Sequence, residues 1–460
     1  MELNKKTFLA LLFSINSLFC YSISLVDLIN YAVDSNIDIQ RAKLQYEQQC
    51  LSSKNSNGAY VASVEINGML KIPGEYNWNN APDSSEASIM YRQPLPGGTQ
   101  ISIETDYSFN SLIIDNETFV LQNPNITFSL SQSLLPFWLQ GSNKDPVKLS
   151  FEYNKQYAYL HLLNTKKDIL LQLIQNYYLY LITLNDIKIN TNTLNLYDEQ
   201  IKSLKELNAI GNTSKSIIIE AENNKWSTEQ SLIVLRTNSM KYIQLIKNLC
   251  GQNFDESLLD LKFSEDIIVQ VRNILDGKID PLDEIYKLQI VSLQNSRVLE
   301  KQSTAPLFNV SVKSNWQLEL AKQNEWSSAW KNFSNISGWS INMGINFSPM
   351  IEEFQKHNKS KYELEQDSLN DDYSSYLLQK SLNERQYNTL LSNSIYQYER
   401  VKSLYESGMR ELFDYEFQYK NKAISKFEYD SVKVRVENTW YAISNLELYI
   451  SLYKICIDLL

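Results

Sequence analysis

The 460-residue sequence predicts an α+β membrane protein built as a tandem structural repeat. Two long stretches with helical apolar spacing are each interrupted by a glycine, at Gly211 and at Gly408. Glycine costs a helix interior about 1 kcal/mol relative to alanine, so each interruption predicts the turn of a helical hairpin. A segment with strand-like alternation precedes each hairpin. The order helix, strands, helix, glycine turn, helix therefore occurs twice.

Composition and charge narrow the class of protein. The net charge is −10 and no basic stripe is present, which argues against nucleic acid as a partner. Hydrophobic residues make up 43% of the chain and charged residues 21%, as in ordinary folded proteins. Cys50, Cys250 and Cys456 are widely spaced, so no disulfide framework is expected, although a single bridge stays possible.

Residues 1–22 have the pattern of a secretory signal peptide. Lys5 and Lys6 precede an apolar run over residues 8–19, which is too short to span a bilayer. Cys20 is an alternative lipid-acceptor site, which the bulky Phe19 before it disfavours. Because no later stretch forms an apolar span of 18 residues, a membrane segment in this exported chain has to be a β-barrel.

The first repeat is expected over residues 23–250. It begins with a helix, continues with a β segment over 59–133 and ends with a helical hairpin over 146–250, whose tip is at Gly211. In the β segment Ile101 and Ile103 alternate with polar residues, and the sequence Pro-Leu-Pro-Gly-Gly over 94–98 predicts a turn. Alternation alone fits membrane strands and a soluble sandwich equally well.

The second repeat is expected over residues 281–460, after a linker over 251–280. Its helix is followed by a β segment over 305–349 and a hairpin over 351–452, with the tip at Gly408. Six of the eight tryptophans lie in or beside the β segments, which predicts an interfacial belt, with ordinary core aromatics as the alternative. These six are Trp78, Trp138, Trp316, Trp326, Trp330 and Trp339.

Over its mature length the chain resembles the TolC-like outer membrane efflux protein family. The resemblance rests on four short motifs in the order in which the family has them. They lie at residues 23–33, 128–135, 305–310 and 345–350. Each motif is loose alone, whereas their repeated order is fairly specific.

The resemblance implies a homotrimer whose chains share one transmembrane β-barrel, surrounded by outer membrane lipid. The helices are then a coiled-coil periplasmic tunnel. The function implied is the exit duct of a tripartite efflux or type I secretion system. A periplasmic adaptor and an inner-membrane RND or ABC transporter are the implied partners, and the pump supplies the energy.

The resemblance also implies a pore aperture at the hairpin tips. The family pattern has a tyrosine three residues before the second-tip glycine, an arginine two after it and aspartates six and nine after it. Tyr405, Gly408, Arg410 and Asp414 match, whereas Phe417 replaces the last aspartate. The implied acidic ring would favour cations. The alternative for these residues is a solvated helix end with an ordinary turn.

The first tip departs from the family pattern. Ile217 stands six residues after Gly211, where the family has an aspartate. The closed-state lock therefore lacks its usual acceptor unless Glu220 or Glu222 takes that role.

Two departures concern size. The strand pair around residues 94–98 is extra, so the barrel either exceeds the twelve strands of the family or leaves this pair outside. From Pro349 to Gly408 the chain advances 59 residues, against 77 from Leu134 to Gly211. The second ascending helix is therefore expected to be shorter by about 27 Å.

No catalytic chemistry is predicted. The only histidines, His161 and His357, stand alone within helical patterns, and no zinc-site spacing, P-loop, dinucleotide fingerprint or nucleophile elbow occurs. We therefore expect neither an enzyme nor a cofactor or metal. The alternative to the channel is a surface structural or adhesive protein that uses its helices as a coiled-coil stalk.

Overall fold

A computed structural model of the chain describes residues 23–71, 84–115, 117–251, 259, 267–277, 280–316, 321–322, 336–346 and 351–460. The predicted signal peptide over 1–22, with Cys20, lies outside these residues. So do Trp78, Trp326 and Trp330.

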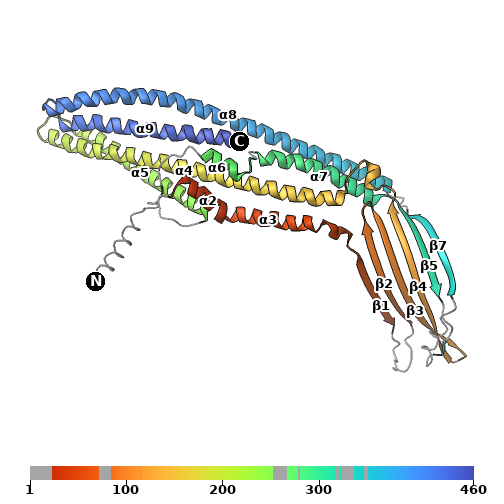
Figure 1. Ribbon diagram of the computed structural model, residues 1–460. Helices are drawn as coiled ribbons and strands as arrows, with labels where there is room; N and C mark the ends of the chain where they lie inside the picture. Colours follow the sequence, from red (N-terminus) through yellow and green to blue (C-terminus); the bar gives the residue numbers. More distant parts are fainter. Residues whose placement is uncertain are drawn as a thin grey trace, which may run out of the picture. The chain divides into compact units, whose positions relative to one another are not determined.

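Long helices and one group of strands make up the described chain (Figure 1). The helices and strands follow one another as α2 (Leu25–Ser35), α3 (Ile37–Lys54), η1 (Ser56–Tyr60), β1 (Ser63–Lys71), β2 (Ser84–Leu95), β3 (Thr99–Ile114), β4 (Glu117–Ser133), η2 (Phe137–Gln140), α4 (Pro146–Ala209), α5 (Lys215–Cys250), α6 (Ile267–Ile274), α7 (Pro281–Thr304), β5 (Leu307–Trp316), β6 (Ala321–Lys322), β7 (Ile336–Asn346), α8 (Ile351–Lys420) and α9 (Lys426–Leu459). The predicted combination of long helices with strands in both halves is confirmed.

The chain divides into two compact units. The helical unit comprises residues up to Gln45, Tyr159–Glu284 and Tyr373–Leu460. The sheet unit comprises Tyr46–Ala158 and Ile285–Asp372, and so contains all the strands together with the adjoining parts of α3, α4, α7 and α8. Both halves of the sequence therefore contribute to each unit.

All the strands belong to one antiparallel sheet, in the order β1-β2-β3-β4-β5-β7, with the short β6 paired to β4. The pairing of β4 with β5 joins the two sequence halves. The strand pair around residues 94–98 is β2 and β3, which lie within the sheet. Gly97 and Gly98 form their turn at positive φ, and a Cβ at Gly98 would lie 2.8 Å from Ser133 Cβ.

The core of the helical unit is built around the N-terminal half of α4. The largest fully buried side chains there are Leu163, Leu170, Leu173, Ile174, Tyr177 and Tyr178. The end of α2 packs on the end of α5, since Asn36 Nδ2 donates to Leu249 O over 2.9 Å. Gly251 has φ +64°, and a Cβ on it would come within 2.6 Å of Ser35 O. This close approach explains the glycine stop at the end of α5.

The turn between α4 and α5 contains Gly211, as the sequence predicts. The amide of Gly211 donates to Asn208 O and the amide of Asn212 donates to Leu207 O, at 3.0 and 2.9 Å. These two bonds define a Schellman motif, whose left-handed residue is Gly211 at φ +79°. Ser214 then occupies the N-cap position of α5.

The predicted tip at Gly408 is wrong. Helix α8 runs without interruption from Ile351 to Lys420, so Gly408 lies inside a helix. A Cβ on Gly408 would lie 3.0 Å from Val436 Cγ2 of α9. The glycine therefore allows α8 and α9 to approach closely at this position. The turn was predicted here because glycine is common in turns, and nothing in the sequence indicated this helix contact.

The second hairpin turns at residues 421–425. The amide of Lys422 donates to Tyr419 O and that of Ala423 to Gln418 O, at 2.9 and 2.8 Å. This is the same Schellman motif, with Lys422 at φ +60° in place of glycine. Ser425 caps α9 three residues later, just as Ser214 follows Gly211, and forms a capping box with Glu428.

The expected shortness of the second ascending helix is also wrong, because the turn lies later in the chain than Gly408. Helix α8 has 70 residues and α4 has 64, so the second ascending helix is not the shorter one. The descending helices α5 and α9 have 36 and 34 residues. The two hairpins are therefore closely similar in length.

Replacing Gly408 with leucine tests its packing role. Leucine is a good helix former, so the expected destabilisation of about 1–3 kcal/mol arises from overpacking against Val436. Urea unfolding followed by circular dichroism measures it. The additional change Val436→Ala should recover part of the loss, and Ser407→Leu, at an exposed neighbouring position, should be nearly neutral. A harmless Gly408→Leu variant contradicts the close contact.

Candidate functional site

One face of the sheet is apolar across all six principal strands. In the strand register Val64, Tyr91, Ile103, Phe128, Val312 and Ile341 form one continuous row. Neighbouring rows contain Ile66 and Ile89 on one side, and Leu130 and Met343 on the other. No Asp, Glu, Lys or Arg stands on this face in the described strands. We call it the apolar face.

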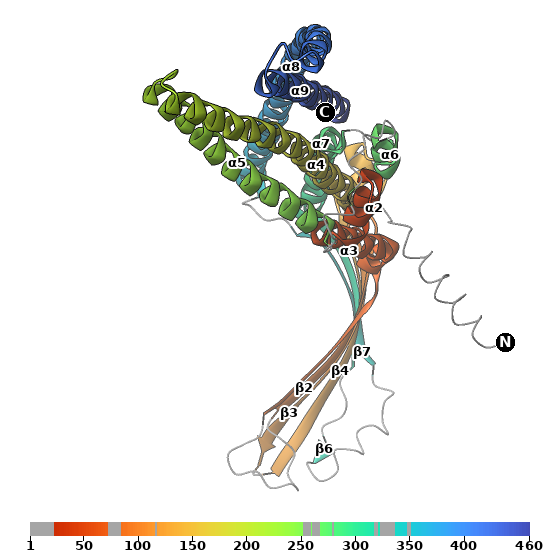
Figure 2. The ribbon, with the colours of Figure 1, turned by 90° about the vertical axis from the view of Figure 1, so that its left-hand side faces the viewer.

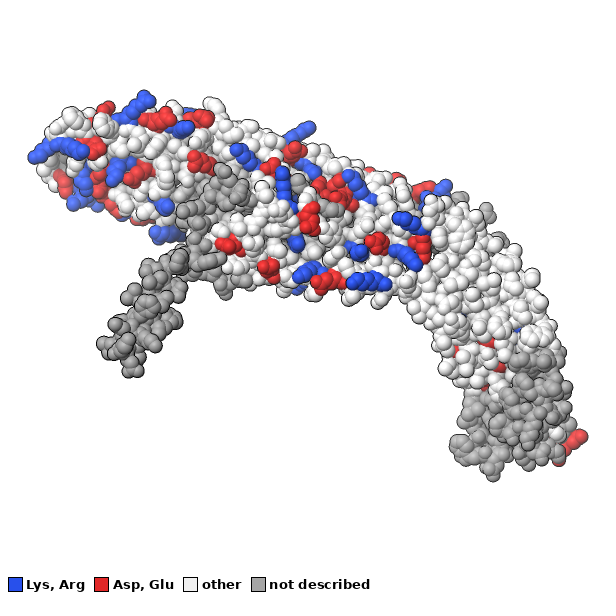
Figure 3. Space-filling model, viewed as in Figure 1, with Lys and Arg blue, Asp and Glu red and all other residues white. Residues whose placement is uncertain are grey.

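The apolar face is exposed in the chain. Ile66 is 75% exposed, Met343 71% and Ile341 65%. In Figures 1 and 2 no helix of the sheet unit lies over it, and the strands in Figure 3 show few charged side chains where the helices show many. From Ile101 to Tyr107 along β3 the face extends for about 20 Å. An uncovered apolar surface of this height fits a hydrocarbon layer.

The opposite face of the sheet is polar and carries charges of both signs. Its rows hold Glu65, Glu104 and Lys313 at one level and Arg92 at the next. Arg92 Nη1 lies 3.3 Å from Glu65 Oε1 across β1 and β2. Alternation along the strands therefore separates a mostly apolar face without charges from a polar, charged face.

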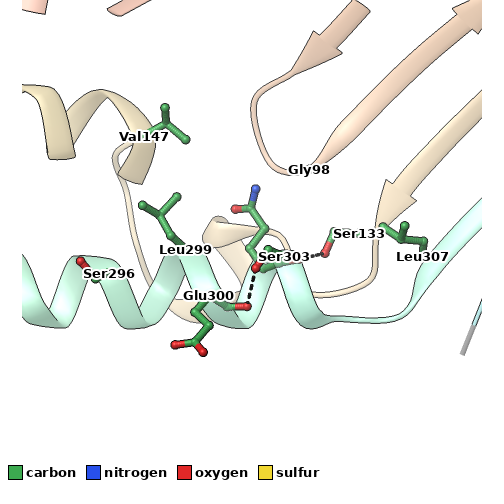
Figure 4. Close-up of a pocket in the computed structure, with 9 residues that line it drawn as sticks. Gly98, Ser133, Val147, Ser296, Leu299, Glu300, Ser303 and Leu307 are labelled. Carbon is green, nitrogen blue, oxygen red and sulfur yellow. Dashed lines mark hydrogen bonds between the residues drawn. The ribbon is translucent and has the colours of Figure 1, made fainter. Parts of the chain in front are cut away.

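The helix-side end of the sheet is joined to α7 around a hollow of about 610 Å³ (Figure 4). Ser133 Oγ, at the end of β4, donates to Gln302 O of α7 over 2.9 Å. Glu300 points away from Gly98 in this view and accepts a hydrogen bond from Asn358 of α8. These contacts fix strand ends to helix ends, and they give the hollow no convergent set of ligand-binding groups.

A row of polar side chains joins α4 of the first hairpin to α9 of the second. Asn185 Nδ2 donates to Asn445 Oδ1 over 2.9 Å, and Asn445 Nδ2 donates to Asp186 Oδ1 over 2.7 Å. Two turns nearer the tips, Asn438 Nδ2 donates to Thr193 Oγ1 over 3.1 Å. We call these contacts the α4–α9 seam. Closer still to the turns, Lys426 Nζ lies 3.8 Å from Glu199 Oε1.

The α4–α9 seam also contains Asn192, whose Nδ2 donates to Asn438 Oδ1 over 3.4 Å. Its spacing is that of a heptad, since Asn185 and Asn192 are seven residues apart, as are Asn438 and Asn445. Polar residues at such positions fix the register of paired helices at some cost in stability. Burial raises the pKa of Asp186, and the hydrogen bond that the Asn445 side chain donates to it opposes that shift. The residues of this seam were not predicted from the sequence, although their seven-residue spacing was a readable signal.

The structure separates the residues predicted for the aperture. Tyr405 and Gly408 lie on the half-buried side of α8, whereas Arg410 and Asp414 are exposed. All four precede the turn at residues 421–425, and Gly211 alone lies in a turn. Of the proposed substitutes at the first tip, Glu222 pairs with Lys205 of α4 over 2.8 Å, and Glu220 is exposed.

Counting the family pattern from Lys422 gives a different set of residues. Tyr419 stands three residues before it and Glu428 six after it, so the tyrosine and one acidic residue keep their places. Ile424 and Ser431 occupy the other two positions. Tyr419 stacks on Tyr429 with centroids 5.2 Å apart. The Ser425 amide and hydroxyl donate to Glu428, which lowers its pKa.

The described part of the chain contains neither a cluster of metal-binding side chains nor a helix that could span a membrane. Across those residues, no three His, Cys, Asp or Glu side chains gather closely enough to hold a metal ion. None of the described helices combines the length and apolarity needed to cross a membrane.

Comparison with known proteins shows the fold. No protein-family model matches the sequence, and no curated protein matches it. Solved structures do match over 95% of the chain. The outer-membrane channel OprN gives a TM-score of 0.59 at 11% identity, with 88% of that chain covered. The Campylobacter jejuni CmeC outer membrane channel gives 0.59 at 12% identity, with 84% covered.

A third match is the outer membrane protein VceC from Vibrio cholerae, with a TM-score of 0.59 at 11% identity and 94% of that chain covered. The chain therefore has the fold of these outer membrane channels, which confirms the predicted TolC-like architecture.

Asp186→Asn tests the α4–α9 seam through its pH dependence. The folded pKa of Asp186 is raised, so this carboxyl favours folding at acid pH and loses that contribution as the pH rises through its folded value. As the pH is raised from about 3 to about 8, the free energy of unfolding of the variant should therefore rise relative to that of the original protein. Urea midpoints at both pH values measure this change. A stability difference between the two proteins that does not vary with pH contradicts the partial burial of Asp186.

Proposed function

We propose that the protein is the outer membrane exit duct of a tripartite efflux or secretion system, acting as a homotrimer. The exposed, uncharged apolar face of a single-layer sheet carries this proposal. In water such a face would be a large aggregation-prone surface, whereas in outer membrane lipid it is satisfied. The polar face then lines an aqueous passage.

The sheet edges support a barrel shared between chains. In the described sheet β1 and β7 are the edge strands, and an unpaired edge is not tolerated in lipid. Placing β1 of one copy beside β7 of the next removes every edge. Three copies of the six principal strands give 3 × 6 = 18 strands, more than the twelve of the family. Barrels of about this size leave a water-filled channel.

The helical hairpins are then the wall of a periplasmic tunnel. Their turns are its far end, where a periplasmic adaptor and an inner-membrane RND or ABC transporter would dock. Movement of substrate through the duct is passive, and the pump supplies the energy. No chemical step is assigned to the protein.

The aperture is proposed at the hairpin turns. Tyr405, Gly408, Arg410 and Asp414 were assigned to it by a pattern centred on Gly408, and the observed turn transfers that pattern to Tyr419 and Glu428. Glu428 from three chains would form an acidic ring that favours cations. Gly211, which lies in the turn of the first hairpin, stays part of the proposed aperture.

Single-channel recording in planar bilayers tests the proposed duct. Protein extracted from the membrane with detergent should be trimeric and should give discrete conductance steps. A stalk-like surface protein would give none. A soluble monomer recovered without detergent would overturn the proposal, because its apolar face would then be covered by other means.

Block of the channel by multivalent cations tests the assignment of the ring. Glu428→Gln removes the charge and keeps a residue suited to the capping box, so block should weaken about tenfold while the fold is retained. Asp414→Asn is the matched control on α8 and should leave block unchanged. The reverse result would restore the aperture to Asp414, and unchanged block in both variants would remove the acidic ring.

A further inference from the structure

The β2–β3 hairpin differs from the other principal strands in what it connects to. Strand β1 follows α3 and η1, β4 leads through η2 into α4, β5 follows α7, and β7 precedes α8. At the same end of the sheet, β2 and β3 meet each other in the turn at Gly97 and Gly98. Four strands of each chain therefore continue toward a helix at this end, whereas the two strands of the hairpin end in a turn.

The turn of the hairpin lies beside the end of β4 (Figure 4). The Ser133 amide donates to Gly98 O, and the Gln132 side chain donates to Gly97 O, both over 3.1 Å. A Cβ on Gly97 would overlap the ring of Trp138 in η2. Both glycines also have positive φ, so side chains are disfavoured here on two grounds. The turn is therefore held against β4 and η2 as part of the sheet unit.

The hairpin interrupts what would otherwise be a pairing of β1 with β4. These two strands run in opposite directions, because each neighbouring pair from β1 to β4 is antiparallel. One apolar row passes through Val64 of β1 and Phe128 of β4, with Tyr91 and Ile103 of the hairpin between them. Removing two strands preserves both the antiparallel direction and the side-chain alternation. Val64 would then stand opposite Phe128 in a sheet of four principal strands.

The number of strands sets the width of a closed barrel. Three chains with four principal strands each would give 3 × 4 = 12 strands, and the hairpins raise this number to 18. Barrel diameter grows roughly in proportion to strand number, so the hairpins increase it about 1.5-fold. The helical tunnel does not widen with the barrel, because the hairpin ends in a turn where the other strands continue toward helices.

The hairpin also changes the charge of the polar face. Four polar rows run from the level of Arg92 to the level of Glu86. Among the side chains that the structure describes in these rows, the other strands contribute one acidic and one basic residue, Glu65 and Lys313. The hairpin contributes three acidic residues and one basic residue, a net charge of −2, with Glu86, Glu104, Asp106 and Arg92. The acidic balance of these rows therefore comes from the hairpin.

We infer that the β2–β3 hairpin is an insertion that widens the membrane outlet of the duct and makes its lining acidic. This inference rests on the proposed trimeric duct, whose passage is lined by the polar face. An acidic lining attracts cations into the outlet. The outlet is then a second acidic stretch of the passage, separate from the proposed aperture at the turns of the helical hairpins.

Electron cryo-microscopy of detergent-extracted trimers tests the widening. The original protein should show a closed barrel of 18 strands. A variant lacking residues 84–114 should still assemble, with 12 strands and an outlet about two-thirds as wide. A barrel of 12 strands in the original protein, with the hairpin outside its wall, overturns the inference. An excised variant whose barrel does not close overturns the description of the hairpin as an insertion.

Thiol labelling of the full-length chain tests the position of the hairpin without removing it. In a Cys50→Ser background, Ser102→Cys on the polar face should react with a charged methanethiosulfonate reagent and change the conductance. Ile103→Cys, its neighbour on the apolar face, should resist that reagent and react with a membrane-permeant maleimide. Equal reaction with the charged reagent at both positions, or none at either, places the hairpin outside the wall and contradicts the inference.

Reversal potentials in a potassium chloride gradient test the acidic lining. In a Glu428→Gln background, which removes the proposed ring at the turns, Glu86→Gln, Glu104→Gln and Asp106→Asn are combined. The ratio of potassium to chloride permeability should fall at least about twofold. Lys313→Gln on the same face is the matched change of opposite sign and should raise this ratio. A ratio that the three combined changes leave unaltered overturns the acidic lining.

The outcomes separate this inference from the proposed duct. Trimers that conduct ions through a barrel of 12 strands overturn the role of the hairpin and leave the duct standing. A protein that neither assembles nor conducts overturns the duct itself.

Discussion

The rest of the structure depends on pairing between the two halves of the sequence. In the sheet unit the pairing of β4 with β5 makes one sheet out of two sets of strands. In the helical unit the hydrogen bonds between α4 and α9 make one row out of two hairpins. Neither half could bury its backbone or its helix faces as completely alone, as is usual for repeats that stack on one another.

The register of the paired strands and the register of the paired helices are fixed by different interactions. Strand register is set by side-chain alternation, because a slip of one residue would move every apolar side chain to the wet face. An apolar helix face alone would permit slips by a turn or a heptad, and hydrogen-bonded amides between the helices remove that freedom. Asn445 at 8% exposure, bonded to both Asn185 and Asp186, shows how tightly the α4–α9 register is specified. The seam therefore favours one alignment of the hairpins over its neighbours.

The two hairpin turns show how one backbone motif accommodates different sequences. Gly211 and Lys422 occupy the same left-handed position, and a serine N-cap follows each after three residues. Lysine in this conformation costs about 1–2 kcal/mol more than glycine. The capping box of Ser425 and Glu428 and the stacking of Tyr419 on Tyr429 offset part of that cost. A glycine is thus neither necessary at a helix turn nor, as at Gly408, sufficient for one.

Periodicity in the sequence by itself determined the repeat, the strands and the long helices, because apolar spacing reports directly on which residues share one face of an element. The Pro-Leu-Pro-Gly-Gly turn was equally readable from its residue types. Tertiary structure alone decided the role of Gly408 and the partner of each helix. Those features depend on contacts between residues far apart in the chain, such as Gly408 with Val436 and Asp186 with Asn445, and local sequence carries no information about such distances. The second turn is held by local contacts, and the capping box of Ser425 and Glu428 was its readable signal.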